Sequence, residues 1–289
     1  MSEKYSFSGH TKVFCLIGYP VEHSMSPTMW NPALQELNLD YVYVAYDVHP
    51  NNLKKAVDGF KALDIKGINV TIPHKEAIIK HLDEIDPIAE KMGAINTIKN
   101  EKGYLIARNT DAAGARKSLI DAGCSLKGSN ILFLGSGGVA RSIAYLLSED
   151  ANKIILTDIV EEKAIGVATE IKNSMQTDIE GKLASEKILA EELKQIDILI
   201  NATPIGMHPK EHTSPISKNL LHKDLFVFDV IYNPMETKLM KEAAEIGCKT
   251  LSGLDMLVNQ GVLAFEWWTG KSPNSKLMKS KIIEFLGIK

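Results

Sequence analysis

Short apolar runs rich in β-branched and aromatic residues alternate along the chain with longer stretches whose apolar positions have helical spacing. In the first part of the chain, the apolar runs are predicted strands and the stretches between them are predicted helices. The predicted strands are 13–18, 41–48 and 67–72, and the predicted helices are 27–37 and 51–63. Because a helix follows each of the first two strands, this order predicts a parallel sheet with right-handed crossovers.

The alternation changes after residue 86 and starts again near residue 129. A short helical stretch at 86–93 precedes 94–111, where Asn-Glu-Lys-Gly at 100–103 predicts the turn of a hairpin. A helix that ends at Gly123 leads into the second series. Its predicted strands are 129–134, 153–158, 197–204, 225–232 and 249–253, with helices from Gly138, at 159–175 and at 237–247. The tail contains two predicted helices, 254–270 and 275–287.

Length and composition allow two domains, since the chain has 289 residues and 45% of them are hydrophobic. We therefore predict an α/β fold with a first domain at 1–111 and a second, Rossmann-type domain with a doubly wound parallel sheet at 112–253. The helices at 254–289 must pack against one of these two domains.

Charge and cysteine content limit the classes of partner. The net charge is −3 and no basic block occurs, which disfavours nucleic acid and favours a small-molecule ligand. The three cysteines are widely spaced, as is typical of reduced thiols in a cytoplasmic protein. The polar N-terminus and the lack of an apolar run of about 20 residues predict a soluble protein without a membrane partner. Composition does not distinguish a monomer from a homodimer.

The sequence Gly-Ser-Gly-Gly-Val-Ala at 135–140 follows a predicted strand and opens a predicted helix, which is the context of a dinucleotide-binding turn. Gly135 allows the tight turn, Gly137 allows close approach of a pyrophosphate, and the helix directs its free N–H groups at that anion. Ala140 is the small residue where the helix packs on the strand. Asp158, about 20 residues later, could accept hydrogen bonds from a ribose. A glycine turn without a ligand, and Asp158 as a simple helix N-cap, are the alternatives.

Other polar residues follow the ends of predicted strands, where ligands bind in open α/β sheets. Asn69 and Thr71 lie near the end of the predicted strand 67–72, Lys75 follows it, and Asp111 lies at the junction of the two domains. A solvated lysine and a helix-capping aspartate are the simpler interpretations of Lys75 and Asp111. His208 and His212 have metal-like spacing, but Pro209 between them disfavours a helix, so we predict a surface loop and no metal site.

Eight motifs together give the chain a resemblance to the shikimate dehydrogenases and the related quinate/shikimate dehydrogenases. They occur in that family's order, at 18–27, 67–76, 93–98, 108–114, 135–140, 201–207, 229–234 and 253–261. The resemblance implies reversible, NAD(P)-dependent interconversion of shikimate and 3-dehydroshikimate in aromatic amino-acid biosynthesis. It also implies that the tail helices pack back against the first domain.

The resemblance implies a role for specific residues of this chain. Lys75 and Asp111 match the catalytic pair, and the sequence does not distinguish a proton transfer by Lys75 alone from one shared by the pair. The positions that match substrate contacts are Ser24, Ser26, Asn69, Thr71, Asn96, Tyr232 and Gln260. The positions that match cofactor contacts are Gly135, Ser136, Gly137, Gly138, Val139, Ala140, Asp158, Thr203, Val230 and Gly253.

The chain departs from the family pattern at two places. Trp30 stands where a histidine is usual, which affects the packing of the predicted helix at 27–37. NADP-dependent members carry Asn-Arg-Thr and another basic residue at the end of the second strand of the nucleotide domain, whereas this chain has acidic residues there, Asp158 among them. We therefore expect NAD to be favoured over NADP by about tenfold, although Lys163 could reduce the difference. Preference for quinate, or a non-catalytic dinucleotide sensor, are the alternative functions.

Overall fold

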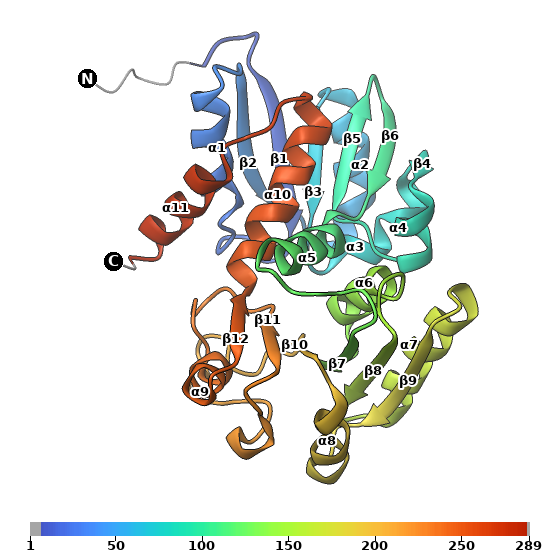
Figure 1. Ribbon diagram of the computed structural model, residues 1–289. Helices are drawn as coiled ribbons and strands as arrows, with labels where there is room; N and C mark the ends of the chain where they lie inside the picture. The colour runs from blue at the N-terminus through green and yellow to red at the C-terminus, as the bar shows by residue number, and fades with distance from the viewer. Residues whose placement is uncertain (1–6, 288–289) are drawn as a thin grey trace. The chain divides into compact units, whose positions relative to one another are not determined.

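The computed structural model describes residues 7–287 and divides the chain into two compact units (Figure 1). The first unit contains the described chain up to Thr110 together with the described residues from Gln260 onward, and the second contains Asp111–Asn259. The predicted division into domains at 1–111 and 112–253 with C-terminal helices at 254–289 stays a prediction.

The first unit is built on a six-stranded mixed sheet with the strand order β2-β1-β3-β5-β6-β4. Strands β1, β2 and β3 are parallel, as predicted, and β5 runs antiparallel to both β3 and β6. The predicted hairpin is confirmed, and its turn residues Lys102 and Gly103 both have positive φ, 58° and 91°. The strands are β1 Lys12–Gly18, β2 Tyr41–Asp47, β3 Gly67–Val70, β4 Glu84–Ile85, β5 Thr97–Glu101 and β6 Tyr104–Arg108.

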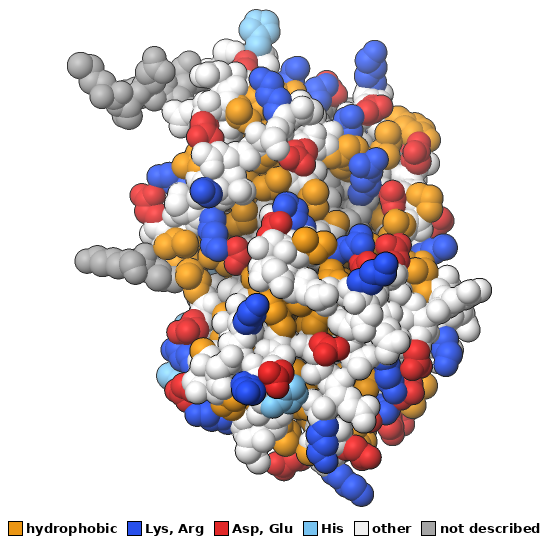
Figure 2. All heavy atoms as spheres, in the orientation of Figure 1, with side chains coloured by type: hydrophobic (Ala, Val, Ile, Leu, Met, Phe, Trp, Pro, Cys, Tyr) orange, Lys and Arg blue, Asp and Glu red, His pale blue; other side chains and the backbone are white. Residues whose placement is uncertain are grey.

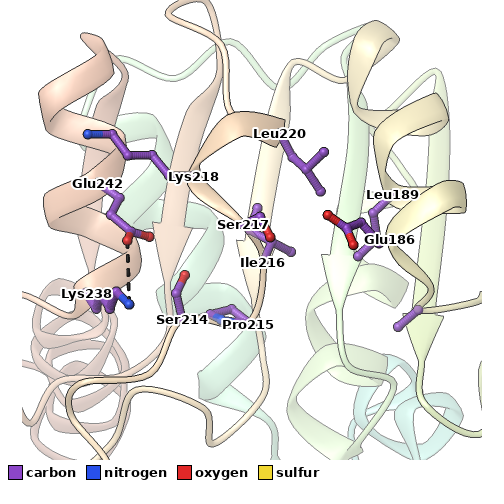
Figure 3. Close-up of a pocket in the computed structure, with 11 residues that line it drawn as sticks. Glu186, Leu189, Ser214, Pro215, Ile216, Ser217, Lys218, Leu220, Lys238 and Glu242 are labelled. Atoms are coloured by element: carbon purple, nitrogen blue, oxygen red, sulfur yellow. Dashed lines mark ion pairs between the residues drawn. The ribbon is translucent and has the colours of Figure 1, made fainter.

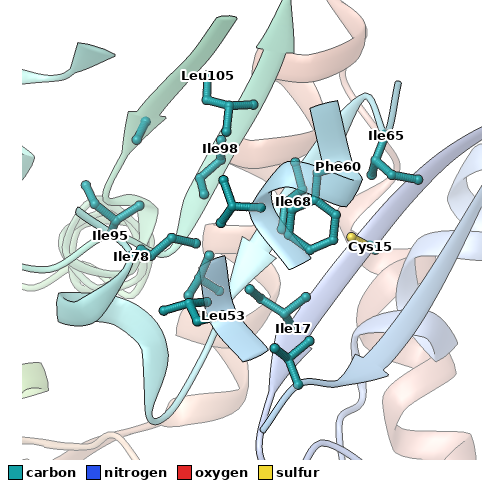
Figure 4. Packing of buried hydrophobic residues seen from close by; sticks show 14 of the residues in the cluster. Cys15, Ile17, Leu53, Phe60, Ile65, Ile68, Ile78, Ile95, Ile98 and Leu105 are labelled. Carbon is teal, nitrogen blue, oxygen red and sulfur yellow. The ribbon is translucent and has the colours of Figure 1, made fainter. Parts of the chain in front are cut away.

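Alternating side chains of β1 enter different layers of the first unit. Cys15 and Ile17 point into the cluster of Figure 4, which helix α2 (Leu53–Ala62) covers with Leu53 and Phe60. Phe14 points to the other face, where its ring stacks on that of Trp268 with centroids 4.8 Å apart. The remaining helices of this unit are α1 Ser26–Glu36, α3 His74–Ala77, α4 Pro87–Met92 and α11 Ser275–Phe285, together with the end of α10 Gly253–Thr269.

The tail helices pack against the first sheet and α1, as predicted. A Cβ atom on Gly67 of β3 would lie 2.4 Å from the Trp268 ring, so only glycine lets α10 approach this closely. A Cβ atom on Gly261 of α10 would lie 2.6 Å from the Met29 side chain of α1. Helix α11 lies beside α1, completing this layer (Figure 1).

The second unit contains a six-stranded, fully parallel sheet with the order β12-β11-β10-β7-β8-β9. The strand order reverses between β7 and β10, which confirms the predicted doubly wound, Rossmann-type fold. The strands are β7 Asn130–Leu134, β8 Lys153–Asp158, β9 Asp178–Leu183, β10 Ile198–Asn201, β11 Phe226–Asp229 and β12 Lys249–Ser252. The helices are α5 Thr110–Asp121, which begins one residue before this unit, α6 Gly138–Leu147, α7 Glu161–Ser174, α8 Glu186–Glu192 and α9 Lys238–Ile246.

Two elements of the second unit were not predicted from the sequence. Strand β9 has the sequence Asp-Ile-Glu-Gly-Lys-Leu and lies at the edge of the sheet, where only Ile179 of the strand is buried. Helix α8 follows it and buries only Leu189. Elements with a single buried side chain have almost no hydrophobic period, so the pattern gave no signal for them.

Charged side chains of both signs are interspersed on the face of each unit that Figure 2 shows. None of the helices among residues 7–287 has the length and apolar character needed to cross a bilayer.

Candidate active site

The polar residues predicted in the first unit gather at one edge of its sheet. Strands β1 and β3 are parallel and end there at Gly18 and Val70. Strand β5 is antiparallel to β3 and starts at the same edge, where Thr97 pairs with Asn69. This edge holds the carboxyl ends of the parallel strands, which is where α/β sheets bind ligands.

The loop after β1 is fixed against the ends of β2 and β3. Tyr19 N donates to Ile72 O at 3.0 Å, and Val21 N donates to Asp47 Oδ1 at 2.7 Å. A Cβ atom on Gly18 would lie 2.5 Å from Thr71 Cγ2, so glycine is required where this loop passes Thr71. The loop and the Thr71 turn therefore form one packed surface.

Ser24 and Ser26 lie next to each other at the start of α1, an eleven-residue helix. Ser26 N donates to Ser24 Oγ at 3.2 Å, and Pro27 occupies the first turn of the helix. Ser24 is half-buried and Ser26 is buried. Hydroxyl donors at the positive end of a helix can bind a carboxylate.

Asn69 and Asn96 belong to a buried hydrogen-bond network at the same edge. Asn69 Nδ2 donates to Asn96 O and to Thr97 Oγ1, both at 3.1 Å. Asn96 Nδ2 donates to Thr110 Oγ1 at 3.0 Å, and Thr110 N donates to Asn96 Oδ1 at 2.7 Å. The sequence analysis did not single out Thr97, because a threonine in a strand gives no functional signal.

Lys75 lies on the short helix α3, half-buried, in a turn that is anchored at both sides. Ile95 N donates to Lys75 O at 2.9 Å. The neighbouring His74 is buried, and its Nε2 lies 2.6 Å from Val48 O, so the ring donates to that carbonyl. His74 was missed in the sequence because a lone histidine beside a lysine is not diagnostic.

Asp111 lies in the first turn of α5, directly after Thr110, and is the first residue of the second unit. Gln260 is buried in the part of α10 that belongs to the first unit. Tyr232 follows β11 in the second unit, and burial raises the pKa of its hydroxyl, which therefore stays protonated at neutral pH.

The glycine turn of the second unit joins β7 to α6 with the geometry that a dinucleotide requires. Gly135 has a φ of +94°, and a Cβ atom on it would lie 3.0 Å from Thr203 Cγ2. Cβ atoms on Gly137 and Gly138 would meet nothing within 4 Å, so the space in front of these residues is open. Within the described residues, no side chain caps the first turn of α6. The open glycines and these uncapped N–H groups fit a pyrophosphate.

The rest of the turn packs α6 against the sheet. Ala140 is fully buried, as predicted for a small residue between helix and strand, and Val139 is half-buried. A larger side chain at 140 would push α6 away from β7.

Asp158 ends β8 and binds the glycine turn. Its Oδ2 accepts hydrogen bonds from Ser136 N at 3.1 Å and from Ser136 Oγ at 2.7 Å, and its Oδ1 accepts one from Val160 N at 3.1 Å. Partial burial acts to raise the pKa of Asp158, but these hydrogen bonds and Lys163 lower it, so the side chain is a carboxylate at neutral pH. The N-cap of α7 is Val160, so the alternative of Asp158 as the helix N-cap is wrong.

The other predicted cofactor residues lie at the carboxyl ends of neighbouring strands. Thr203 follows β10, and its hydroxyl donates to Asn201 Oδ1 at 2.7 Å. A Cβ atom on Gly253 would lie 2.0 Å from Val230 O, so the two positions are in contact and residue 253 must be glycine. All ten predicted cofactor residues therefore belong to the second unit.

Asp229 is a fully buried carboxyl group at the end of β11 that the sequence analysis did not single out. It accepts hydrogen bonds from Asn201 Nδ2 at 3.1 Å and from Thr237 Oγ1 at 2.7 Å. Burial raises the pKa of Asp229, although these bonds oppose the shift. The group ties β10 and β11 to the N-terminus of α9.

A pocket of about 370 Å³ in the second unit contains none of the predicted site residues (Figure 3). Both lysines of its lining have an acidic partner, since Lys238 Nζ lies 3.7 Å from Glu242 Oε1 and Lys218 binds Glu245. The predicted surface loop lies nearby in sequence, and there His208 Nδ1 is 2.8 Å from Glu211 Oε1. This pocket is not the candidate active site.

Comparison with known proteins identifies the family. The model of the shikimate dehydrogenase substrate binding domain matches residues 16–98, and that of the shikimate 5'-dehydrogenase C-terminal domain matches 253–283. Shikimate dehydrogenase (NADP(+)) of Methanocaldococcus jannaschii is 50% identical over 275 residues, which cover 95% of this chain and 97% of the relative. The chain belongs to the shikimate dehydrogenase family.

Solved structures of the family have the same fold. Shikimate 5-dehydrogenase from Listeria monocytogenes, in complex with shikimate and NAD, is 36% identical with a TM-score of 0.91, covering 98% of this chain and 99% of its own. Quinate dehydrogenase from Corynebacterium glutamicum, in complex with NAD, is 30% identical with a TM-score of 0.88, covering 95% and 99%. The predicted family, fold and enzyme class, an NAD(P)-dependent oxidoreductase, are confirmed.

Proposed function

We propose that this protein is a shikimate dehydrogenase that interconverts shikimate and 3-dehydroshikimate with NAD or NADP, in aromatic amino-acid biosynthesis. The observation that carries the proposal is one sheet edge in the first unit, where Ser24, Ser26, Thr71 and Lys75 follow strand ends and Asn69 lies near the end of β3. Family membership supports the reaction type.

The serine pair would hold the carboxylate end of the substrate. Shikimate carries a carboxylate and three hydroxyls on one ring, so its site must bind an anion at one end and the reacting carbinol at the other. Ser24 and Ser26 lie at the positive end of α1, where their hydroxyls can donate to the anion. Asn69, Thr71, Asn96 and Gln260 would bind the rest of the ring, together with Tyr232.

Lys75 would move the proton at the reacting end. A nicotinamide held by the second unit would supply the hydride-transfer chemistry, so a basic group of the protein must take the proton of the carbinol hydroxyl and return it in the reverse reaction. Lys75 is the candidate for this transfer, with its turn held by the Ile95 and His74 hydrogen bonds. Asp111 would orient the ammonium and the substrate hydroxyl.

The cofactor would bind at the strand ends of the second unit, with its pyrophosphate at Gly137 and Gly138. We propose that NAD is preferred because Asp158 is a carboxylate, which can accept from ribose hydroxyls but repels a 2′-phosphate. The relatives include both an enzyme named for NADP(+) and complexes with NAD, so the preference rests on Asp158 alone.

An absorbance assay of the purified protein tests this function. Shikimate or quinate is mixed with NAD or NADP, and formation of the reduced nicotinamide is followed. We expect turnover with shikimate, faster with NAD. Binding of the dinucleotide without turnover of either acid would support a sensor instead.

Quinate is the second candidate substrate, because a quinate dehydrogenase shares the fold over nearly the whole chain. Quinate carries one added hydroxyl, which a site excludes poorly by shape alone, so some activity on both acids is consistent with this site. A higher kcat/KM for quinate than for shikimate would reverse our assignment. We further propose that the protein is cytoplasmic, in keeping with its three free cysteines. We also propose that it acts as a monomer or a homodimer.

A further inference from the structure

Tyr43 is a buried tyrosine of β2 whose phenol reaches the candidate substrate site. The residue is only 1% exposed. Its side chain extends across β1 to β3, where Tyr43 Oη donates to Asn69 Oδ1 at 2.8 Å. A buried hydroxyl bonded to a predicted substrate residue can control how that residue meets the substrate.

Two neighbouring residues of α1 hold Tyr43 in place. Asn31 Nδ2 donates to Tyr43 O, and Tyr43 N donates to Asn31 Oδ1, both at 2.9 Å, so one amide side chain binds both backbone groups of Tyr43 on the edge strand β2. The Trp30 ring stacks on the Tyr43 ring with centroids 4.8 Å apart and planes 24° apart. Trp30 in turn stacks on Phe265 of α10. The residue that departs from the family pattern therefore packs directly on Tyr43.

The amide of Asn69 has one position left for a ligand. Both hydrogens of Nδ2 are used, one by Asn96 O and the other by Thr97 Oγ1. Tyr43 occupies one of the two lone pairs of Oδ1. The orientation of the amide is thereby fixed, and the remaining position is an acceptor.

Tyr43 remains a donor at any working pH. Burial, the largest cause, raises the pKa of Tyr43 well above the ordinary value, and Cys15 adds to this, while a hydrogen bond from Ser26 opposes it. The phenol thus donates to Asn69, at the proposed ring end, and is close enough to Ser26, at the proposed carboxylate end, for that side chain to lower its pKa.

We propose that Tyr43 is a positioning residue that fixes the Asn69 amide, so that Asn69 presents only an oxygen acceptor to the substrate. This rests on the proposed function. A ring hydroxyl can donate to that oxygen, whereas the ketone of 3-dehydroshikimate, which only accepts, finds no partner there. Asn69 then binds a ring hydroxyl in preference to the ketone. The ketone therefore binds at the end of the site that holds Lys75.

A double-mutant cycle tests this role. We expect Tyr43→Phe to raise the KM for shikimate about tenfold, or about 1.4 kcal/mol, with a much smaller change in kcat. In an Asn69→Ala background the same change should have almost no further effect, because the residue through which Tyr43 acts is gone. Tyr46→Phe is the control, since Tyr46 lies on the same strand with 45% exposure and should keep the parent KM.

Two kinetic results would overturn the proposal. One is an unchanged KM in Tyr43→Phe. The other is an equal increase in KM in both backgrounds, which is the mark of a general structural role.

Thermal unfolding separates this proposal from the proposed function. If Tyr43 and Asn69 are coupled, the two changes together lower the melting temperature by less than the sum of the single changes. An additive pair overturns the proposal whatever the substrate is. A parent protein without shikimate turnover would overturn the proposed function and leave this coupling standing.

Discussion

The two serines at the start of α1 combine two attractions for an anion. Each hydroxyl can donate a hydrogen bond, and the first turn of the helix adds its partial positive charge. In the proposed function neither serine takes part in the hydride or proton transfer, so we expect their removal to affect substrate binding.

Ser24→Ala and Ser26→Ala should therefore mainly weaken substrate binding. We expect each to cost roughly 1 to 3 kcal/mol, seen as a higher KM for shikimate with kcat little changed, since each change removes a donor to a charged group. Steady-state kinetics at varied shikimate concentration give both constants. If both variants kept the KM of the parent, the carboxylate would have to bind elsewhere.

The expected cofactor preference also depends on a single residue, Asp158. We expect the parent to favour NAD by about tenfold in kcat/KM, or about 1.4 kcal/mol, and Asp158→Arg to shift toward NADP, because a cation replaces the repelling carboxylate. Asp158→Asn is the matched control, since it removes the charge but keeps an oxygen for Ser136 N and should only narrow the preference. A parent that favours NADP, or an Arg variant that does not shift, contradicts this role.

Single residues were predictable from the sequence where their type is unusual for their place, and not where it is ordinary. Lys75 and Asn69 stood out as polar residues just past or within an apolar strand. Tyr43 did not, because a tyrosine in a strand fits the pattern of core packing. His74 binds Val48 O and Asp229 binds Asn201, residues far away along the chain, and no local pattern encodes such contacts.

At the scale of elements, the packing of α10 on β3 depends on the absence of one side chain. The Trp268 ring occupies the space that a Cβ atom on Gly67 would need. Strand and helix can meet this closely only because residue 67 is glycine.

Gly67→Ala should destabilise the protein by about 1 to 3 kcal/mol, the usual cost of overpacking a core. Gly59→Ala is the matched control, because a Cβ atom on Gly59 in α2 meets nothing within 4 Å and alanine favours a helix. The control should leave the free energy of unfolding unchanged or raise it by up to about 1 kcal/mol. Denaturant unfolding measures both, and equal stability of Gly67→Ala and the parent would contradict the close contact.

Elements were predictable in proportion to the apolar surface that they bury. The strands of the second sheet from β7 to β11 have long buried runs, with β9 as the exception at the edge. The antiparallel pairing of β5 with β6 was predictable from the hairpin turn between them, and not from the hydrophobic pattern of β5 itself. The pairing of β5 with β3 is a long-range contact that the sequence alone did not reveal.

At the scale of the whole molecule, the proposed substrate residues and the proposed cofactor residues belong mainly to different units. The first unit carries Lys75 and the proposed substrate residues other than Tyr232, and the second unit carries the proposed cofactor residues together with Tyr232 and Asp111. The order of alternating strands and helices predicted both α/β units, and the ordered motifs predicted the family. The return of the tail to the first sheet came only from the family resemblance, because an amphipathic helix does not specify its partner.

The most direct test of this account is the turnover of Lys75→Ala at saturating shikimate and cofactor. We expect kcat to fall by about 10²-fold or more while the dissociation constant of shikimate changes little, because the group that carries the proton is gone and the binding residues remain. Lys80→Ala, at an exposed lysine five positions on, is the control and should keep the parent kcat. A Lys75→Ala variant with near-normal kcat would contradict the central claim.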